Sequence, residues 1–90
     1  MKISDIKQEK IKEQILATIF SKTPQALFTS HIAQEIARDE EFIKKLLNEL
    51  KSKKLVIEIK KNSQGIKYIR RSRWRLEDLV YQAYKDKQSN

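Results

Sequence analysis

The chain has 90 residues, 39% of them hydrophobic, and a net charge of +8, a balance that predicts one small basic domain. It has no cysteine, which excludes disulfides, thiolate zinc sites and cysteine nucleophiles. One histidine and one glycine leave no basis for a histidine-rich metal site or a glycine-rich phosphate loop. We therefore expect no enzyme activity, no metal and no cofactor.

The sequence also contains no signal for membrane insertion or export. No apolar run approaches the ~18–20 residues that a membrane-spanning helix needs, so we expect no membrane partner. The first residues lack the hydrophobic segment of a secretory signal. The expected location is the cytoplasm, in association with the nucleoid, or the nucleus of a eukaryotic cell. We expect residues 1–86 to form a single domain and residues 87–90 to be a frayed tail.

The first predicted helix begins near Ser4, whose hydroxyl can cap the free amides, and ends around Ser21 and Lys22. Pro24 has no amide donor, so residues 23–25 are predicted to form a loop. The apolar stripe of the helix follows three- and four-residue spacings and comprises Ile6, Ile11, Ile15, Leu16, Ile19 and Phe20. The opposite face is expected to carry Lys7, Lys10, Lys12 and Glu13.

Two further helices are predicted after a short apolar strand at residues 26–28. The second helix spans about two turns and is expected to begin at a cap provided by Thr29 or Ser30. Asp39 is expected to cap the third helix, which runs to about Ser52. The apolar stripe of the third helix comprises Phe42, Ile43, Leu46, Leu47 and Leu50. Its outward positions are Glu40, Glu41, Lys44, Lys45, Asn48 and Lys51.

The periodicity then changes from helical to alternating, which predicts a strand over residues 55–60. Residues 61–65 have turn chemistry, because Gly65 adopts positive φ without steric cost. The returning strand of this predicted hairpin comprises Ile66, Tyr68 and Arg70.

The last predicted element is a fourth helix that follows Trp74. An indole between two arginines can stack on a nucleic-acid base, but a place in the core is the favoured interpretation. The apolar stripe of the fourth helix comprises Leu76, Leu79, Val80, Ala83 and Tyr84.

Positive charge is concentrated in one quarter of the chain. Residues 51–75 hold ten lysines and arginines and one acid, Glu58, so this segment carries +9 and the remaining residues together carry −1. A basic surface that serves only solubility would be spread over the chain, whereas a cluster of one sign is typical of a polyanion-binding surface. The charge pattern therefore predicts contact with nucleic acid.

Two helices joined by a tight turn and followed by a β-hairpin resemble the winged helix-turn-helix family. The matching segments are residues 29–37 (TSHIAQEIA), 42–50 (FIKKLLNEL) and 53–56 (KKLV), and the resemblance covers roughly residues 8–84. One departure is Lys54, where many members have a glycine. The resemblance implies a mainly helical α+β fold with a three-helix core, a β-hairpin wing and an additional C-terminal helix. It also implies binding of double-stranded DNA, with the third helix in the major groove.

The residues expected to contact DNA combine this resemblance with the charge pattern. Lysine can donate to guanine and asparagine pairs with adenine, so the third helix is expected to contribute Lys44, Lys45, Asn48 and Lys51. The wing is expected to contribute Lys60, Lys61, Asn62, Ser63, Gln64 and Lys67. Additional phosphate contacts are expected from Ser30, His31, Arg70, Arg71 and Arg73.

The leading hypothesis is a small transcriptional regulator that binds double-stranded DNA with strong or weak sequence preference. Asp39, Glu40 and Glu41 would repel phosphates at the start of the third helix, which favours the alternative of a protein–protein interaction module. Acids at a helix start also stabilise the helix dipole, and Lys45 could pair with Glu49 on a solvated face. A second alternative is RNA or ribosome association, because the outline is similar to a small ribosomal-protein winged helix.

Small regulators of this family often form dimers through their terminal helices. The apolar stripes of the first and fourth helices therefore favour a homodimer through these two helices, with Leu79, Tyr81 and Tyr84 as candidate contacts. The same stripes could instead close the core of one chain.

Overall fold

All four predicted helices are present in the computed structural model, which describes residues 4–60 and 71–88. Helix α1 (Asp5–Lys22) begins as predicted at Ser4, whose hydroxyl accepts a hydrogen bond from the Lys7 amide at 3.3 Å. Helix α3 (Glu40–Ser52) also begins as predicted, because the Asp39 carboxylate accepts from the Phe42 amide at 3.1 Å. These caps satisfy backbone donors that the first turn of each helix leaves free.

Helix α2 (Thr29–Ile36) begins in a way that the sequence did not indicate. Its N-cap is Phe28, no side chain of the described residues caps its first amides, and Thr29 lies inside the helix. The Thr29 hydroxyl instead accepts a hydrogen bond from the Trp74 indole N–H at 2.8 Å. The prediction of a Thr29 or Ser30 cap is therefore wrong, because the buried indole donor needs an acceptor and Thr29 supplies it. The helix ends at Ala37, whose φ of 61° turns the chain toward α3.

Three short antiparallel strands form one sheet in the order β1-β3-β2. They are β1 (Leu27–Phe28), β2 (Val56–Ile59) and β3 (Arg73–Leu76). Strand β3 is central, and its Trp74 is paired with Leu27 on one side and with Glu58 on the other.

The return strand of the hairpin differs from the prediction in position. Its described part is β3, whereas the predicted return through Ile66, Tyr68 and Arg70 lies outside the described residues. Leu76 was predicted on the last helix but is a buried residue of β3 opposite Val56. Pairing with β2 extends the strand to Leu76, and the helix begins only at Asp78.

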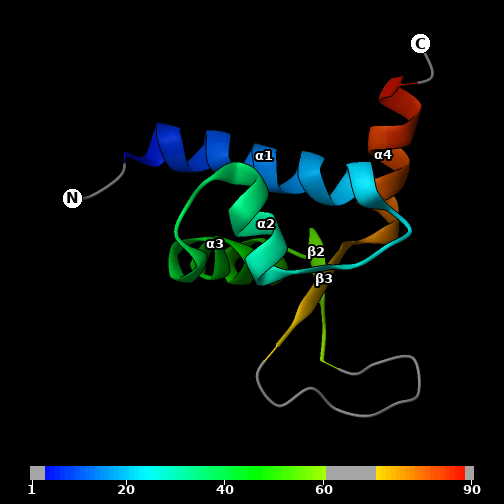
Figure 1. Ribbon diagram of the computed structural model, residues 1–90. Helices are drawn as coiled ribbons and strands as arrows, with labels where there is room; N and C mark the ends of the chain where they lie inside the picture. Colours follow the sequence, from blue (N-terminus) through cyan, green and yellow to red (C-terminus); the bar gives the residue numbers. More distant parts are fainter. Residues whose placement is uncertain (1–3, 61–70, 89–90) are drawn as a thin grey trace.

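The core lies between the apolar stripes of α1, α2 and α3 and one face of the sheet. Figure 1 shows α1 running across α2 and α3, while β2 and β3 project from the other side of the molecule. Trp74 is fully buried, as predicted, so the indole belongs to the core. The other buried apolar residues are Ile11, Ile15, Ile19, Leu27, Ile32, Ala33, Ile43, Leu46, Leu47, Leu50, Val56 and Leu76.

Helix α4 (Asp78–Gln88) follows β3 and lies beside the end of α1 (Figure 1). It continues to Gln88, two residues beyond position 86, where the predicted domain ends. The ring of Phe20 lies 5.4 Å from the ring of Tyr81 and 5.3 Å from that of Tyr84, measured between centroids. Over residues 4–60 and 71–88, no helix is long and apolar enough to cross a membrane.

Candidate nucleic-acid interface

The outward face of α3 presents two lysines and an asparagine. Lys44, Lys45 and Asn48 are exposed, as predicted, and together with Glu41, Glu49 and Ser52 they line an open hollow of about 550 Å³. The opposite face of the helix is buried through Ile43, Leu46, Leu47 and Leu50. Since burial of this apolar stripe fixes the rotation of α3, the three polar side chains are held toward the solvent.

A second hollow, of about 220 Å³, lies where the starts of α2, α3 and β3 meet. It is lined by Phe28, Thr29, Ser30, Glu40, Lys44, Arg71 and Ser72. Lys44 lines both hollows, so they adjoin at this side chain. The first residues of α2 line this hollow, and no side chain of the described structure caps that helix. Its first amides and the positive end of its dipole therefore lie at this hollow without a side-chain partner.

An aromatic ring supports one of the cations at the second hollow. The guanidinium carbon of Arg71 lies 5.8 Å from the centroid of the Phe28 ring, a cation–π arrangement. His31 contacts the same ring edge-on, with 5.5 Å between the centroids. Ser30, His31 and Arg71 are exposed, so three predicted phosphate contacts lie close together on the surface.

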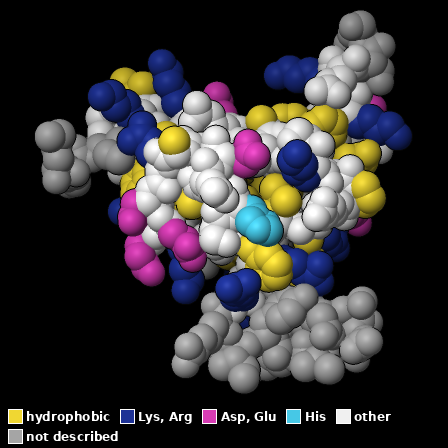
Figure 2. Space-filling model, in the orientation of Figure 1, with side chains coloured by type: hydrophobic (Ala, Val, Ile, Leu, Met, Phe, Trp, Pro, Cys, Tyr) yellow, Lys and Arg dark blue, Asp and Glu magenta, His cyan; other side chains and the backbone are white. Residues whose placement is uncertain are grey.

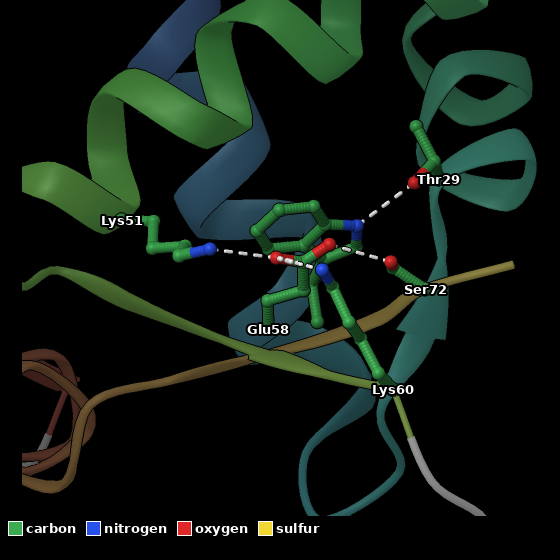
Figure 3. A network of polar contacts seen from close by, with 6 residues as sticks. Thr29, Lys51, Glu58, Lys60 and Ser72 are labelled. Carbon is green, nitrogen blue, oxygen red and sulfur yellow. Dashed lines mark hydrogen bonds and ion pairs between the residues drawn. The ribbon is translucent and has the colours of Figure 1, made fainter. Parts of the chain in front are cut away.

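Two other predicted contacts are held by a carboxylate. Lys51 donates to Glu58 at 2.7 Å, and the Lys60 ammonium lies 3.9 Å from the same oxygen, Oε1. The Ser72 hydroxyl donates to the other oxygen, Oε2 (Figure 3). The Glu58 side chain is only 9% exposed, so this carboxylate neutralises positive charge at the base of the wing.

The environment of Glu58 keeps it ionised. Burial alone would raise the pKa of its carboxyl group, but hydrogen bonds from Lys51 and Ser72 and the positive charges of Lys51 and Lys60 outweigh it. The net effect is a pKa below the ordinary 4.5. The carboxylate is therefore negatively charged near neutral pH.

Glu49 has a different partner from the one considered in the sequence. It pairs with Lys12 of α1 at 3.5 Å rather than with Lys45, and Lys12 also contacts Glu9 at 3.3 Å. Lys12 was predicted on the outer face of its helix but is only 6% exposed, because Glu49 of α3 approaches it from the neighbouring helix. Among the described residues, neither Lys44 nor Lys45 takes part in an ion pair.

The remaining predicted contacts divide into two groups. Arg73 is half-buried on β3, and its neighbour Arg75 pairs with Asp78 at 3.3 Å. The other group lies outside the described residues, so contact with DNA through it stays a prediction; it comprises Lys61, Asn62, Ser63, Gln64, Lys67 and Arg70.

Two residues important to the geometry were not singled out as functional from the sequence. Glu58 could have been found, because it is the only acid among the ten basic residues of its segment and lies two positions after buried Val56, on the same face of the strand. Phe28 carried no such signal, since its contact with Arg71 depends on the pairing of β1 with β3. Figure 2 shows lysine and arginine side chains in several places on this face, and several acidic side chains at its left edge with others elsewhere.

Known structures provide a comparison, although no family model and no curated protein sequence matches this chain. MepR of S. aureus in complex with DNA has a TM-score of 0.71 at 21% identity, over 94% of this chain and 69% of that one. A mutant of Lactococcus lactis ZitR has a TM-score of 0.70 at 18% identity, over 99% of this chain and 56% of that one. The PcaV transcriptional regulator of Streptomyces coelicolor, solved with its natural ligand, has a TM-score of 0.62 at 18% identity, over 87% of this chain and 53% of that one.

These likenesses concern the fold, and this chain spans little more than half the length of ZitR and PcaV. This chain has the order of helices and strands expected for a winged helix, with β3 in the centre of its sheet. It also superposes on these proteins over most of its length. The predicted fold class is thereby confirmed. The chain has the winged helix-turn-helix fold, with a three-helix core, strands that lead into a wing and an additional helix α4.

Proposed function

We propose that this chain is the double-stranded DNA-binding domain of a transcriptional regulator. The observation that carries the proposal is the pair of adjoining hollows, because their exposed lysines and arginine lie together on a winged helix-turn-helix fold. MepR, which has the same fold, is known in complex with DNA. Lys44 and Lys45 form no ion pair among the described residues, which leaves them available to phosphates or base edges.

The two hollows suit different parts of a duplex. The second hollow offers Lys44, Arg71 and the first amides of α2, which are donors of the kind that bind phosphate oxygens. The first hollow offers Asn48 and Lys45 on an exposed helix face, which suits base edges in a major groove. We therefore assign backbone contact to the start of α2 and base contact to the middle of α3.

The acids at the start of α3 are compatible with this assignment. Asp39 is occupied as the N-cap of the helix, where it accepts from the Phe42 amide. Glu40 and Glu41 lie in the first turn, where a negative charge stabilises the helix dipole by about 0.3–1 kcal/mol. Local helix chemistry thus accounts for these carboxylates, and the lysine-bearing part of α3 lies one turn further along.

The test is a titration of fluorescent duplex DNA by anisotropy between about 50 and 200 mM salt, with duplex RNA in parallel. Binding should weaken with a log–log slope of about −4 to −5, as four to six phosphate contacts predict. Arg71→Ala should weaken binding to every sequence and flatten the slope by about 0.9. Lys10→Ala removes the same charge from the exposed face of α1 and serves as the matched control.

Three results would contradict the proposal. Salt-insensitive or absent binding would favour a protein partner, and tighter binding of duplex RNA would favour the ribosome-associated alternative. An equal effect of Arg71→Ala and Lys10→Ala would remove the second hollow from the interface.

We also propose that two copies associate through α1 and α4. Leu79 is 86% exposed, and no residue of α4 is buried, so this helix retains an uncovered side. Two of the candidate contacts, Tyr81 and Tyr84, pack partly on Phe20 of their own chain, which leaves Leu79 as the stronger candidate. The two α3 helices of such a dimer would lie one helical turn of DNA apart, ~34 Å.

A further inference from the structure

Glu58 lies where α3 meets β2 and β3, the two strands that lead into the wing. Lys51 belongs to the last turn of α3, Lys60 directly follows β2, and Ser72 directly precedes β3. All three donate to or pair with one carboxylate (Figure 3). On the neighbouring position of β3, the Trp74 indole is bonded to Thr29 of α2. The base of the wing is therefore joined to both helices of the helix-turn-helix.

The same carboxylate also neutralises part of the positive charge of Lys51 and Lys60. Lys51 and Lys60 each remain partly exposed, with 48% and 57% of the side chain accessible, so both ammonium groups are near the solvent while they pair with Glu58. Without the carboxylate, these two lysines would join Lys44, Lys45 and Arg71 as free cations on one face. A surface with more free cations binds any duplex more tightly, because each neutralised phosphate releases a counterion whatever the sequence.

We propose that Glu58 is a positioning and specificity-determining residue: it fixes β2 and β3 against α3 and pairs with Lys51 and Lys60, which lowers affinity for non-cognate DNA. This inference rests on the proposed DNA-binding function. Strands β2 and β3 held at a fixed angle to α3 let only some duplex geometries contact these strands and α3 together, whereas a surface with two extra unpaired cations accommodates any duplex. Discrimination between sites is therefore gained at the expense of total affinity.

The test uses Glu58→Gln, which keeps the shape and the hydrogen-bonding oxygen but removes the charge. Two probes are needed: a duplex selected from a random pool by the wild-type protein, and an unrelated duplex of equal length. The variant should bind the unrelated duplex several-fold more tightly. Its salt slope should be steeper by about 0.9 for each lysine that is released. The ratio of the two affinities should fall.

Two further variants separate charge from folding. Glu13→Gln makes the same charge change at an exposed position of α1 that forms no ion pair among the described residues, and should leave the slope and the ratio at the wild-type values. Glu58→Asp keeps the charge on a shorter side chain and should restore the wild-type slope.

Each outcome bears on a different claim. If Glu58→Gln only destabilises the fold, both duplexes lose affinity equally at an unchanged slope, and the inference is overturned. A wild-type protein that binds duplex DNA but selects no preferred sequence also overturns the inference, while the proposed function stands. A wild-type protein that binds no duplex overturns the proposed function and this inference with it.

Discussion

Two ionised side chains that are largely buried join separate elements of this small molecule. Lys12 links α1 to α3 through Glu49, and Glu58 links β2 to α3 through Lys51. Burial alone would lower the pKa of Lys12, but the hydrogen bond with Glu9 and the negative charges of Glu49 and Glu9 outweigh it and raise the pKa above 10.5. Each charge is thus retained because its partners compensate for the loss of water.

The pKa of Glu58 predicts how stability depends on pH. Because its folded pKa lies below the ordinary 4.5, the carboxylate stabilises the folded state above that pH. This contribution is lost as the pH falls through the folded-state pKa. The free energy of unfolding of Glu58→Gln, measured by urea titration with circular dichroism, should approach the wild-type value as the pH falls from 4.5 through the folded-state pKa. A constant difference between the two proteins from pH 7 downward would contradict this expectation.

At the scale of elements, the hydrogen bond between Trp74 and Thr29 connects the central strand to α2. Thr29→Val keeps the size and branching of the side chain but leaves the buried indole N–H without its acceptor. The free energy of unfolding should fall by about 1–3 kcal/mol, the usual penalty for an unsatisfied buried donor. Thr29→Ser retains a hydroxyl and is the matched control in thermal denaturation. Equal melting temperatures for the Val and Ser variants would show that the bond contributes little.

Helix α3 carries the prediction about sequence preference. Asn48 is exposed in the middle of the helix, on the hollow assigned to base edges. Asn48→Ala should change which duplexes are selected from a random pool, since a bidentate pair with adenine provides about 1–3 kcal/mol of discrimination. Affinity for unrelated duplexes should change little, because an amide neutralises no phosphate. A uniform loss across all sequences would assign Asn48 to the backbone instead.

The elements that could be predicted from the sequence are those determined by neighbouring residues. Ser4 and Asp39 cap helices through amides three positions away, so both starts were correct. The start of α2 was wrong because Thr29 is bonded to a residue 45 positions later in the chain. Lys12 and Leu76 were misplaced for the same reason, since Glu49 and Val56 come from other elements. Local patterns contain no information about such partners.

The candidate site follows the same division. The outward positions of α3 follow from its helical period, so Lys44, Lys45 and Asn48 were predicted to be exposed and are exposed. The pairing of Lys51 and Lys60 with Glu58 could not be predicted from composition, because it depends on which face of β2 carries the Glu58 side chain. Charge clustering therefore predicted a basic surface but not which of its described cations are paired with a carboxylate.

At the scale of the whole molecule, the uncovered side of α4 predicts an oligomer. Leu79→Glu places a charge on this side, so the proposed homodimer should dissociate in sedimentation equilibrium. The dissociated chain should stay folded, with an unchanged circular dichroism spectrum, because the side chain is 86% exposed and makes little contribution to the core of one chain. Gln34→Glu, at an exposed position of α2 outside the proposed interface, is the matched control for the added charge. A wild-type monomer, or a dimer unaffected by Leu79→Glu, would contradict the proposed interface.

The burial of Trp74 has a practical consequence. It is the only tryptophan of the chain, and its ring is shielded from solvent at the junction of the sheet with α2. Intrinsic fluorescence excited at the indole band therefore reports on this one junction. A duplex resting on the outer surface cannot quench the ring by direct stacking. A change in emission on adding DNA would mean that the packing around the central strand changes, so the native protein reports its own internal rearrangement without an added label.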